Sequence, residues 1–373
     1  MFKEIIPYGL LDRKVQEDIF FESDFPIHLS AECLLVASLF SKMLAGKEVV
    51  LDSPVDIKLL KNIEELQNIW VGWFPEFQSI DLSSLKTCES QTEESGDFVG
   101  VFFTGGVDSF YSYLKHRDEV THIIYVQGFD LDYKDSVLLS SVSETLKKIA
   151  NEFDVELIQV RTNLRDYFNE SLEWGKHAHG EALATVGLLL KNSFSKIYIA
   201  SSFFKETLFS CWGSHPDIDS LWSTGSLKFV HDGLEVNRLE KVGSIIKSPV
   251  ALNYLRVCYT NKKSLYNCCR CEKCVRTMVS LDAFGVLGEC ASFPEEITKA
   301  KVKKIVVVNN VVRDFLEENI AYLKQNRPSY PYLKELEEAL EGPSFRAKCS
   351  LFYKKKKLRL VSICQYYLDK FFH

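Results

Sequence analysis

The sequence has no run that approaches the ~18 apolar residues of a membrane-spanning helix, so we expect no transmembrane segment. It opens Met1-Phe2-Lys3-Glu4, without the apolar stretch of a secretory signal, which predicts a cytoplasmic protein. An excess of Lys and Arg is also missing, because the formal net charge is −6. That balance argues against a chain that binds nucleic acid non-specifically over its whole surface, and leaves only a local basic patch open.

Two common catalytic patterns are absent as well. No Gly-x-Ser-x-Gly occurs, and nothing around Cys211 supports a nucleophile, so we do not pursue serine or cysteine hydrolases. There is no internal repeat and no long low-complexity tract. What is present is a chain of 373 residues, 46% hydrophobic and 13% aromatic, which is enough for one large or two medium domains with sizeable cores.

Residues 1–95 are interpreted as an N-terminal α/β extension that ends in a polar linker. The predicted elements are strands at 18–22 and 48–52 and helices at 31–44 and 56–73. Ser30 is expected to cap the first helix and Gly46 to end it. An aromatic stripe in this unit is predicted to pack against the next unit rather than to bind a ligand; it comprises Trp70, Trp73, Phe74 and Phe77.

Residues 96–295 alternate strands with helices. Strands are predicted at 98–103, 122–126, 156–160 and 197–200, and helices at 108–116, 134–153 and 178–190. This alternation predicts an α/β fold with a doubly wound parallel sheet, whose ligand crevice lies at the carboxyl ends of the strands. Residues 296–373 are predicted to be a helical C-terminal region with a basic tail at 354–372, which we interpret as a solvated face.

A glycine loop between a predicted buried strand and a predicted helix reads Thr104-Gly105-Gly106-Val107-Asp108-Ser109. Adjacent glycines let the backbone approach an anion, and the start of the helix directs unpaired amides toward it. Thr104 and Ser109 add hydroxyl donors, and Asp108 suits a Mg²⁺ ion that bridges phosphates. The lysine of a kinase-type loop is missing, so the pattern predicts a phosphate-binding loop of another class.

Five of the eleven cysteines fall between 258 and 274. Cys258 precedes Cys268, Cys271 and Cys274, and the last three are each separated by two residues, so their thiolates can turn toward one ion. We predict a closed structural Zn²⁺ site with Cys269 pointing away, and we assign the metal no catalytic role. An iron–sulfur cluster and a redox pair are the alternatives.

Single polar residues near the crevice are weaker candidates. His177 and His179 precede the helix after the third strand, where they either contact substrate or cap the helix, and His215 is similar. Lys241 either neutralises charge on a leaving pyrophosphate or is a surface lysine. Asp130 follows the second strand and is interpreted as incidental.

The glycine loop resembles the Ser-Gly-Gly-x-Asp-Ser signature of the PP-loop ATP pyrophosphatases, with Thr104 in place of the leading Ser. The cysteine run, with Tyr259 after the first cysteine and Arg276 after the last, resembles the 7-cyano-7-deazaguanine synthases, which bind zinc there. This resemblance covers roughly residues 98–290. It implies an adenine nucleotide alpha hydrolase-like fold with ATP, Mg²⁺ and Zn²⁺. It makes Asp108, Ser109 and Lys241 the expected catalytic residues, and His179 is added to them from its position near the crevice, not from the resemblance.

Members of this group adenylate a carboxylate, amide or carbonyl oxygen, release pyrophosphate, and let a nucleophile displace AMP. The resemblance therefore implies an AMP-forming carbon–nitrogen ligase that activates a small-molecule carboxylate or carbonyl for attack by ammonia or an amine, giving an amide or nitrile. No glutaminase region is visible, so ammonia is expected to be free or to come from a partner, and a homo-oligomer stays open. Substrate contacts are expected from 174–181 and 210–226, where the family pattern breaks.

Three alternatives stay open at this stage. One is sulfur transfer to an RNA base or small molecule, which needs a sulfur-carrying cysteine. A second is a nucleotide-binding module without turnover, against which the retention of Asp108 and Ser109 argues. The third is deazaguanine synthesis itself.

Overall fold

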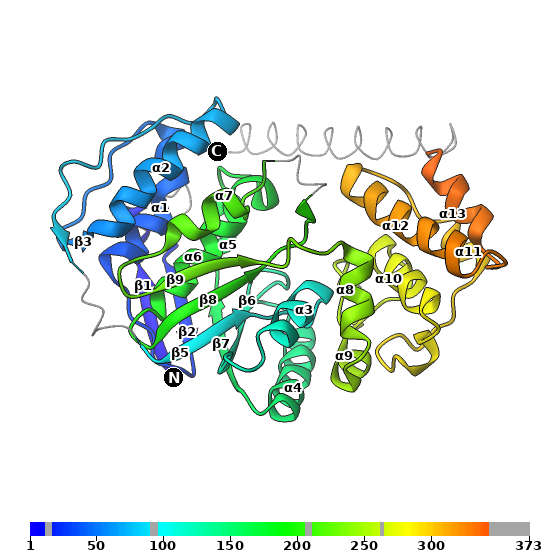
Figure 1. Ribbon diagram of the computed structural model, residues 1–373. Coiled ribbons are helices and arrows are strands. Elements are labelled where there is room, and N and C mark those ends of the chain that lie inside the picture. Colours follow the sequence, from blue (N-terminus) through cyan, green and yellow to red (C-terminus); the bar gives the residue numbers. More distant parts are fainter. Residues whose placement is uncertain (12–16, 90–95, 206–210, 262–264, 343–373) are drawn as a thin grey trace, which may run out of the picture.

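The computed structural model of the chain describes residues 1–11, 17–89, 96–205, 211–261 and 265–342. Its centre is a seven-stranded sheet in the order β1-β2-β7-β6-β5-β8-β9 (Figure 1). These strands are β1 (Phe2–Ile6), β2 (Ile19–Ser23), β5 (Phe98–Phe102), β6 (His122–Gln127), β7 (Glu156–Thr162), β8 (Phe194–Ala200) and β9 (Lys228–Asp232). Strands β5 to β9 pair in parallel, whereas β1 and β2 join antiparallel at the β7 edge. The predicted α/β class with a mostly parallel sheet is confirmed.

The order of the parallel strands creates a switch point beside β5. The chain runs from β5 outward to β6 and β7, then returns across β5 to β8 and β9. The connection that follows β5 therefore leads to one side of this strand, and the connection that enters β8 leads to the other side. This reversal opens a crevice at the carboxyl ends of β5 and β8.

Helices cover both faces of the sheet, because both faces of the inner strands are apolar. Ile123 and Tyr125 of β6 face one hydrophobic cluster, and Ile124 and Val126 face the other. The second of these faces is covered by α1 (Ala31–Ala45), α2 (Ile57–Trp73) and α6 (His179–Leu189). The other face is covered by α3 (Val107–Lys115), α4 (Ser136–Phe153), α8 (Arg238–Ile245), α9 (Pro249–Tyr254) and α10 (Glu272–Ala283).

The N-terminal region shares the core of the sheet. Ser30 caps α1 by accepting a hydrogen bond from the amide of Cys33, and Gly46 ends the helix in the left-handed conformation, as predicted. Trp70 is fully buried and stacks on Phe40 at 3.8 Å between ring centroids, so the prediction that the aromatic stripe is packing is confirmed.

Several strand assignments differ from the sequence-based expectation. The predicted strand at 48–52 is wrong, because those residues pair with no neighbour and Val50 is 81% exposed. The two-residue strand β3 (Val55–Asp56) follows instead and pairs with β4 (Thr87–Cys88). Strands β1 and β9 were not predicted, since each is a short, partly polar strand at an edge of the sheet.

The region after residue 295 is mainly helical as far as the structure describes it, as predicted. It contains α11 (Lys299–Val302), α12 (Asn310–Asn326) and α13 (Leu333–Leu340), and α12 packs on α8 and α10. Short helices α5 (Leu164–Phe168) and α7 (Pro216–Asp219) complete the α-helices of the described residues. The predicted basic tail at 354–372 lies outside the described residues. Among the helices described, none is both long and apolar enough to cross a membrane.

Candidate functional site

The glycine loop lies at the carboxyl end of β5, where the sequence predicted it. Gly105 has φ +74°, a left-handed conformation that favours glycine, and Gly106 is the N-cap of α3. The carbonyl of Gly105 accepts a hydrogen bond from the amide of Arg256 at 2.7 Å. Ser109 donates its hydroxyl to the carbonyl of Gly106 at 3.1 Å. The first amides of α3 consequently point out of the loop without an intrahelical acceptor.

A pocket of about 220 Å³, which we call the carboxyl-end pocket, opens beside this loop. The loop residues Thr104, Gly106, Val107, Asp108 and Ser109 line one side. The charged and titratable side chains around it are Asp130, His179, Arg238, Arg256 and Lys273, with Tyr259 nearby. Basic groups thus outnumber the carboxylates of Asp108 and Asp130, and the apolar part of the wall comes from β5, α6 and β8.

Asp108 is held by two cations from α8. Arg238 approaches one carboxylate oxygen at 2.5 Å and Lys241 the other at 3.5 Å, and Ser202 donates to the same carboxylate at 3.3 Å. Burial alone would raise the pKa of Asp108, but the charges of Arg238 and Lys241 lower that pKa to about 2. Asp108 is therefore a carboxylate at any physiological pH.

Lys241 lies behind Asp108 rather than on the pocket wall. It is 1% exposed, and its ammonium donates to the carbonyl of Ser201 at 2.6 Å. Burial lowers the pKa of Lys241, and the Asp108 carboxylate partly offsets this effect. Its position fits a residue that orients Asp108, with Arg238 closer to any ligand.

The three candidate histidines separate in space. His179 lines the carboxyl-end pocket, and burial lowers its pKa, so its ring is neutral at pH 7. His177 packs edge-on against Phe74 at 4.8 Å between ring centroids. His215 packs on Trp73 at 4.7 Å and accepts from the amide of Asp217, which caps α7.

The expected substrate stretches are therefore only partly at the pocket. Among the described residues, 174–181 contributes His179, whereas no residue of 211–226 lines this pocket. Residue 210 lies outside the described part of the chain. The expectation that His215 contacts substrate does not fit the structure, because the aromatic surface of α2 covers this histidine.

The four predicted cysteine ligands converge. The sulfur atoms of Cys258, Cys268, Cys271 and Cys274 all lie within 4.8 Å of one another. Two of these sulfurs accept backbone amides, Cys268 from Cys271 at 3.3 Å and Cys271 from Cys274 at 3.4 Å, as α10 begins. A tetrahedral zinc with Zn–S bonds of about 2.3 Å needs this kind of spacing. The donor set and its geometry thus fit one Zn²⁺, and we call these residues the four-cysteine cluster.

The two cysteines Cys269 and Cys258 show where the four-cysteine cluster ends and what it borders. Cys269 has φ +52° and donates its thiol toward the carbonyl of Asn267, so it points away from the cluster as predicted. Cys258 also lines the carboxyl-end pocket, which places the cluster directly in the pocket wall.

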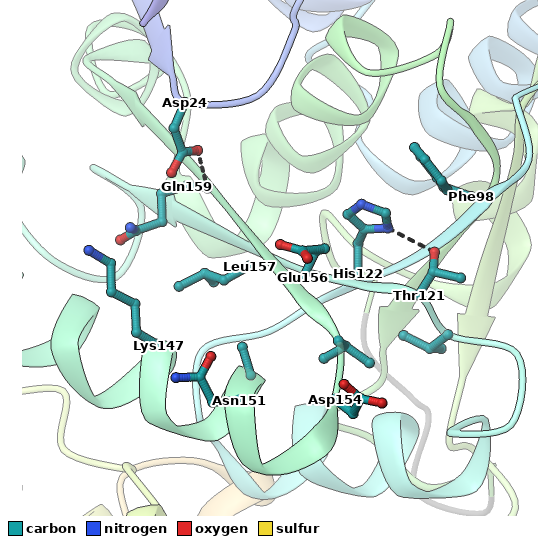
Figure 2. A pocket seen from close by; sticks show the side chains of 13 residues that line it. Asp24, Phe98, Thr121, His122, Lys147, Asn151, Asp154, Glu156, Leu157 and Gln159 are labelled. Carbon is teal, nitrogen blue, oxygen red and sulfur yellow. Dashed lines mark hydrogen bonds between the residues drawn. The ribbon is translucent and has the colours of Figure 1, made fainter.

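A larger pocket of about 670 Å³, the amino-end pocket, lies at the opposite ends of β6 and β7. Figure 2 shows Lys147 and Asn151 on α4 facing His122, Glu156 and Gln159 from the strands. The carboxylates of its lining come from Asp24, Asp154 and Glu156, against the single basic side chain of Lys147. It contains none of the residues expected to act in the site.

Sequence reasoning missed three cations of the carboxyl-end pocket. Arg238 lies three residues before Lys241, and Lys273 stands within the cysteine run, but neither was singled out from the sequence. Arg256 carried no signal of its own beyond lying two residues before Cys258. Only the folded chain brings these residues from α8, α10 and the intervening loop to one place.

Comparisons with models of protein families, with curated protein sequences and with solved structures give no match for this chain.

Proposed function

We propose that the chain is an ATP-dependent, AMP-forming ligase whose reaction takes place in the carboxyl-end pocket. The observation that carries this proposal is the convergence of the glycine loop with Arg238, Arg256 and Lys273 on one small pocket at a switch point of the sheet. A left-handed glycine turn, the start of a helix and several cations together form an environment suited to a polyphosphate.

ATP fits the donors present. The amides at the start of α3, with the hydroxyls of Thr104 and Ser109, offer hydrogen bonds to phosphate oxygens. Arg238 and Lys273 offer charge-assisted contacts on the opposite side. In the proposed reaction a substrate carboxylate or carbonyl oxygen attacks the α-phosphate, pyrophosphate leaves, and ammonia or an amine then displaces AMP.

Mg²⁺ would be held by carboxylates of the same pocket. Asp130 is exposed to the pocket, and Asp108 is kept ionised beside it. Bound to both, the ion would neutralise charge on the phosphates. Asp108 pairs with Arg238 in this structure, so metal and nucleotide binding would exchange this ion pair for contacts to the ligand.

Zn²⁺ would be held by the four-cysteine cluster as a structural ion. Four sulfurs complete its coordination and leave no position for a water molecule. An iron–sulfur cluster remains the alternative occupant of the same four thiols.

The side chains that line the carboxyl-end pocket favour an amine over a sulfur nucleophile. Among the pocket-lining residues that the structure describes, Cys258 is the one cysteine, and it belongs to the four-cysteine cluster. The neutral ring of His179 lies at this wall, where it can accept a proton from an attacking amine.

Product analysis tests the proposal directly. The protein is incubated with ATP, Mg²⁺ and ammonia against a panel of carboxylates, and nucleotides are separated by anion exchange. We expect AMP and pyrophosphate, with a loss of at least about tenfold in Ser109→Ala, which removes a loop hydroxyl. Ser140→Ala, on the exposed side of α4, is the matched control. Release of ADP and phosphate would place the loop in another reaction class.

A further inference from the structure

We infer that the four-cysteine cluster positions Arg256 and Lys273 as a subsite for the terminal phosphates of the nucleotide, so that affinity for pyrophosphate depends on the metal in the cluster. This inference rests on the proposed function, because it assigns a ligand to one side of the same pocket. It gives the metal a role in ligand binding beyond holding the fold together.

Arg256 connects the cluster to the glycine loop. It lies two residues before Cys258, and its amide donates to the carbonyl of Gly105 at 2.7 Å. Its side chain is 5% exposed and binds Asn261 through one terminal nitrogen at 2.8 Å. The Nε atom of Arg256 is buried without a partner, although the residue lines the carboxyl-end pocket. A buried guanidinium with an unused donor beside a phosphate-type loop indicates a missing anionic partner.

Lys273 is a cation of the cluster that faces the pocket. It stands between the ligands Cys271 and Cys274, on the first turn of α10. Its two cationic neighbours are paired with acids, Arg270 with Glu295 at 2.9 Å and Arg276 with Glu272 at 2.7 Å. No hydrogen bond or ion pair holds the Lys273 ammonium among the described residues, and this side chain lines the carboxyl-end pocket. Its charge is therefore available to a ligand.

Asn267, which directly precedes the cluster residue Cys268, binds the backbone on both sides of Arg256. Its amide oxygen accepts from the backbone of Val257 at 3.0 Å and of Cys258 at 3.2 Å, and its amide nitrogen donates to the carbonyl of Leu255 at 2.8 Å. Asn267 itself precedes Cys268. A metal bonded to all four thiolates would fix the Arg256 segment against the start of α10, because Cys258 belongs to one and Cys271 and Cys274 to the other. Without metal this link depends on weaker contacts.

The first experiment compares two charge removals within the cluster. Lys273→Gln and Arg270→Gln are titrated by calorimetry with inorganic pyrophosphate and, separately, with adenosine. We expect pyrophosphate to bind about tenfold more weakly to Lys273→Gln, with adenosine binding and zinc content unchanged, because the lost contact involves phosphate alone. Arg270→Gln, whose side chain points to Glu295 at the surface, should bind pyrophosphate like the wild type. Unchanged pyrophosphate affinity in Lys273→Gln would overturn the inference, as would an equal loss for adenosine.

The second experiment removes the metal from the wild-type chain with a chelator while circular dichroism follows the fold. We expect pyrophosphate affinity to fall at least as far as in Lys273→Gln and to return with added Zn²⁺. A folded, metal-free protein that binds pyrophosphate as tightly as the metal-loaded form would contradict the coupling. Should the metal-free chain unfold, the Lys273→Gln comparison decides the phosphate subsite, and an affinity of the still folded protein that does not fall at partial metal loss contradicts the coupling. Release of ADP in the turnover assay would defeat the proposed function while leaving these binding results in force.

Discussion

Two pockets at opposite ends of the sheet differ in size and in charge. The amino-end pocket holds about 670 Å³ and presents three carboxylates, whereas the carboxyl-end pocket holds about 220 Å³ and presents three basic side chains with the glycine loop. Volume alone would favour the amino-end pocket, whereas the proposed nucleotide site is the smaller carboxyl-end pocket. The arrangement of backbone donors and cations distinguishes the two, because phosphate recognition needs both.

The direction of the helices explains the contrast. At the carboxyl ends α3 begins with Gly106 as N-cap and α8 begins with Arg238, so the positive ends of their dipoles meet the pocket. At the amino ends α4 finishes at Phe153, and its C-cap Asp154 lines the amino-end pocket (Figure 2). A helix C-terminus with added carboxylates repels a phosphate. Substitutions that change one pocket and leave the other intact test this difference between the two pockets.

The largest effect is expected from Cys271→Ser, which removes a metal ligand in the wall of the carboxyl-end pocket. Purified wild-type protein should contain one Zn²⁺ per chain by elemental analysis, and the variant should contain almost none. Since a structural zinc contributes folding free energy directly, we expect a loss of several kcal/mol in denaturant unfolding. Cys88→Ser, at an exposed position of β4, is the control and should keep its metal. Wild-type protein that is metal-free as purified and fully stable would show that the cluster is not a structural metal site.

The next effect is expected from Asp108→Asn. Its carboxylate compensates Arg238 and Lys241, so its loss leaves two cations in a largely buried setting and should cost about 3 kcal/mol of unfolding free energy. ATP turnover should be abolished as well. Full ATP turnover by the Asp108→Asn variant would show that Asp108 takes no part in the reaction.

A smaller effect should separate His179 from His215. His179→Gln removes a pocket-lining ring, and we expect substrate-dependent turnover to fall at least about tenfold with little change in thermal stability. His215→Ala removes an N-cap and an aromatic contact, and should cost about 1 kcal/mol of stability with normal turnover. The reverse pattern would move the substrate to the α2 side of the sheet.

Asp108 of the carboxyl-end pocket and His122 of the amino-end pocket should titrate in different pH windows. The pKa of Asp108 is lowered to about 2, so its contribution to stability is present above its unfolded value of 3.8 and is lost as pH falls toward 2. Burial lowers the pKa of His122 in the amino-end pocket, so the unfolded chain binds a proton that the folded chain does not as pH falls below 6.5. Stability should therefore fall as pH falls through that window. His122→Phe, among Phe25, Phe98 and Phe194, should reduce this slope in pH-dependent unfolding, and the share of His179 should remain. An unchanged slope would contradict the assignment.

The smallest effect is expected from Lys147→Gln in the amino-end pocket. The change removes its one basic side chain but touches neither the glycine loop nor the four-cysteine cluster. We expect wild-type pyrophosphate binding and ATP turnover, and a stability change within about 0.5 kcal/mol. A loss of nucleotide binding comparable to that of Lys273→Gln would erase the distinction between the pockets.

The sequence by itself determined the local features of this protein. Apolar runs and caps predicted the inner strands β5 to β8 and the helices between them, because burial on both faces and capping leave strong local signals. The spacing of Cys258, Cys268, Cys271 and Cys274 predicted their convergence, since three of them lie within one turn and its flank. The adjacent glycines likewise predicted the tight turn at Gly105.

Tertiary structure decided what the local patterns could not express. Edge strands β1 and β9 form because a neighbouring strand is there to pair with, while 48–52 has no such neighbour despite its suitable residues. Whether a polar residue is a ligand or part of the packing likewise depends on distant segments. Lys241 is buried behind Asp108, His215 is covered by α2, and Lys273 faces the pocket. Their sequence neighbourhoods do not reveal these positions, because charge and burial are properties of the folded surroundings.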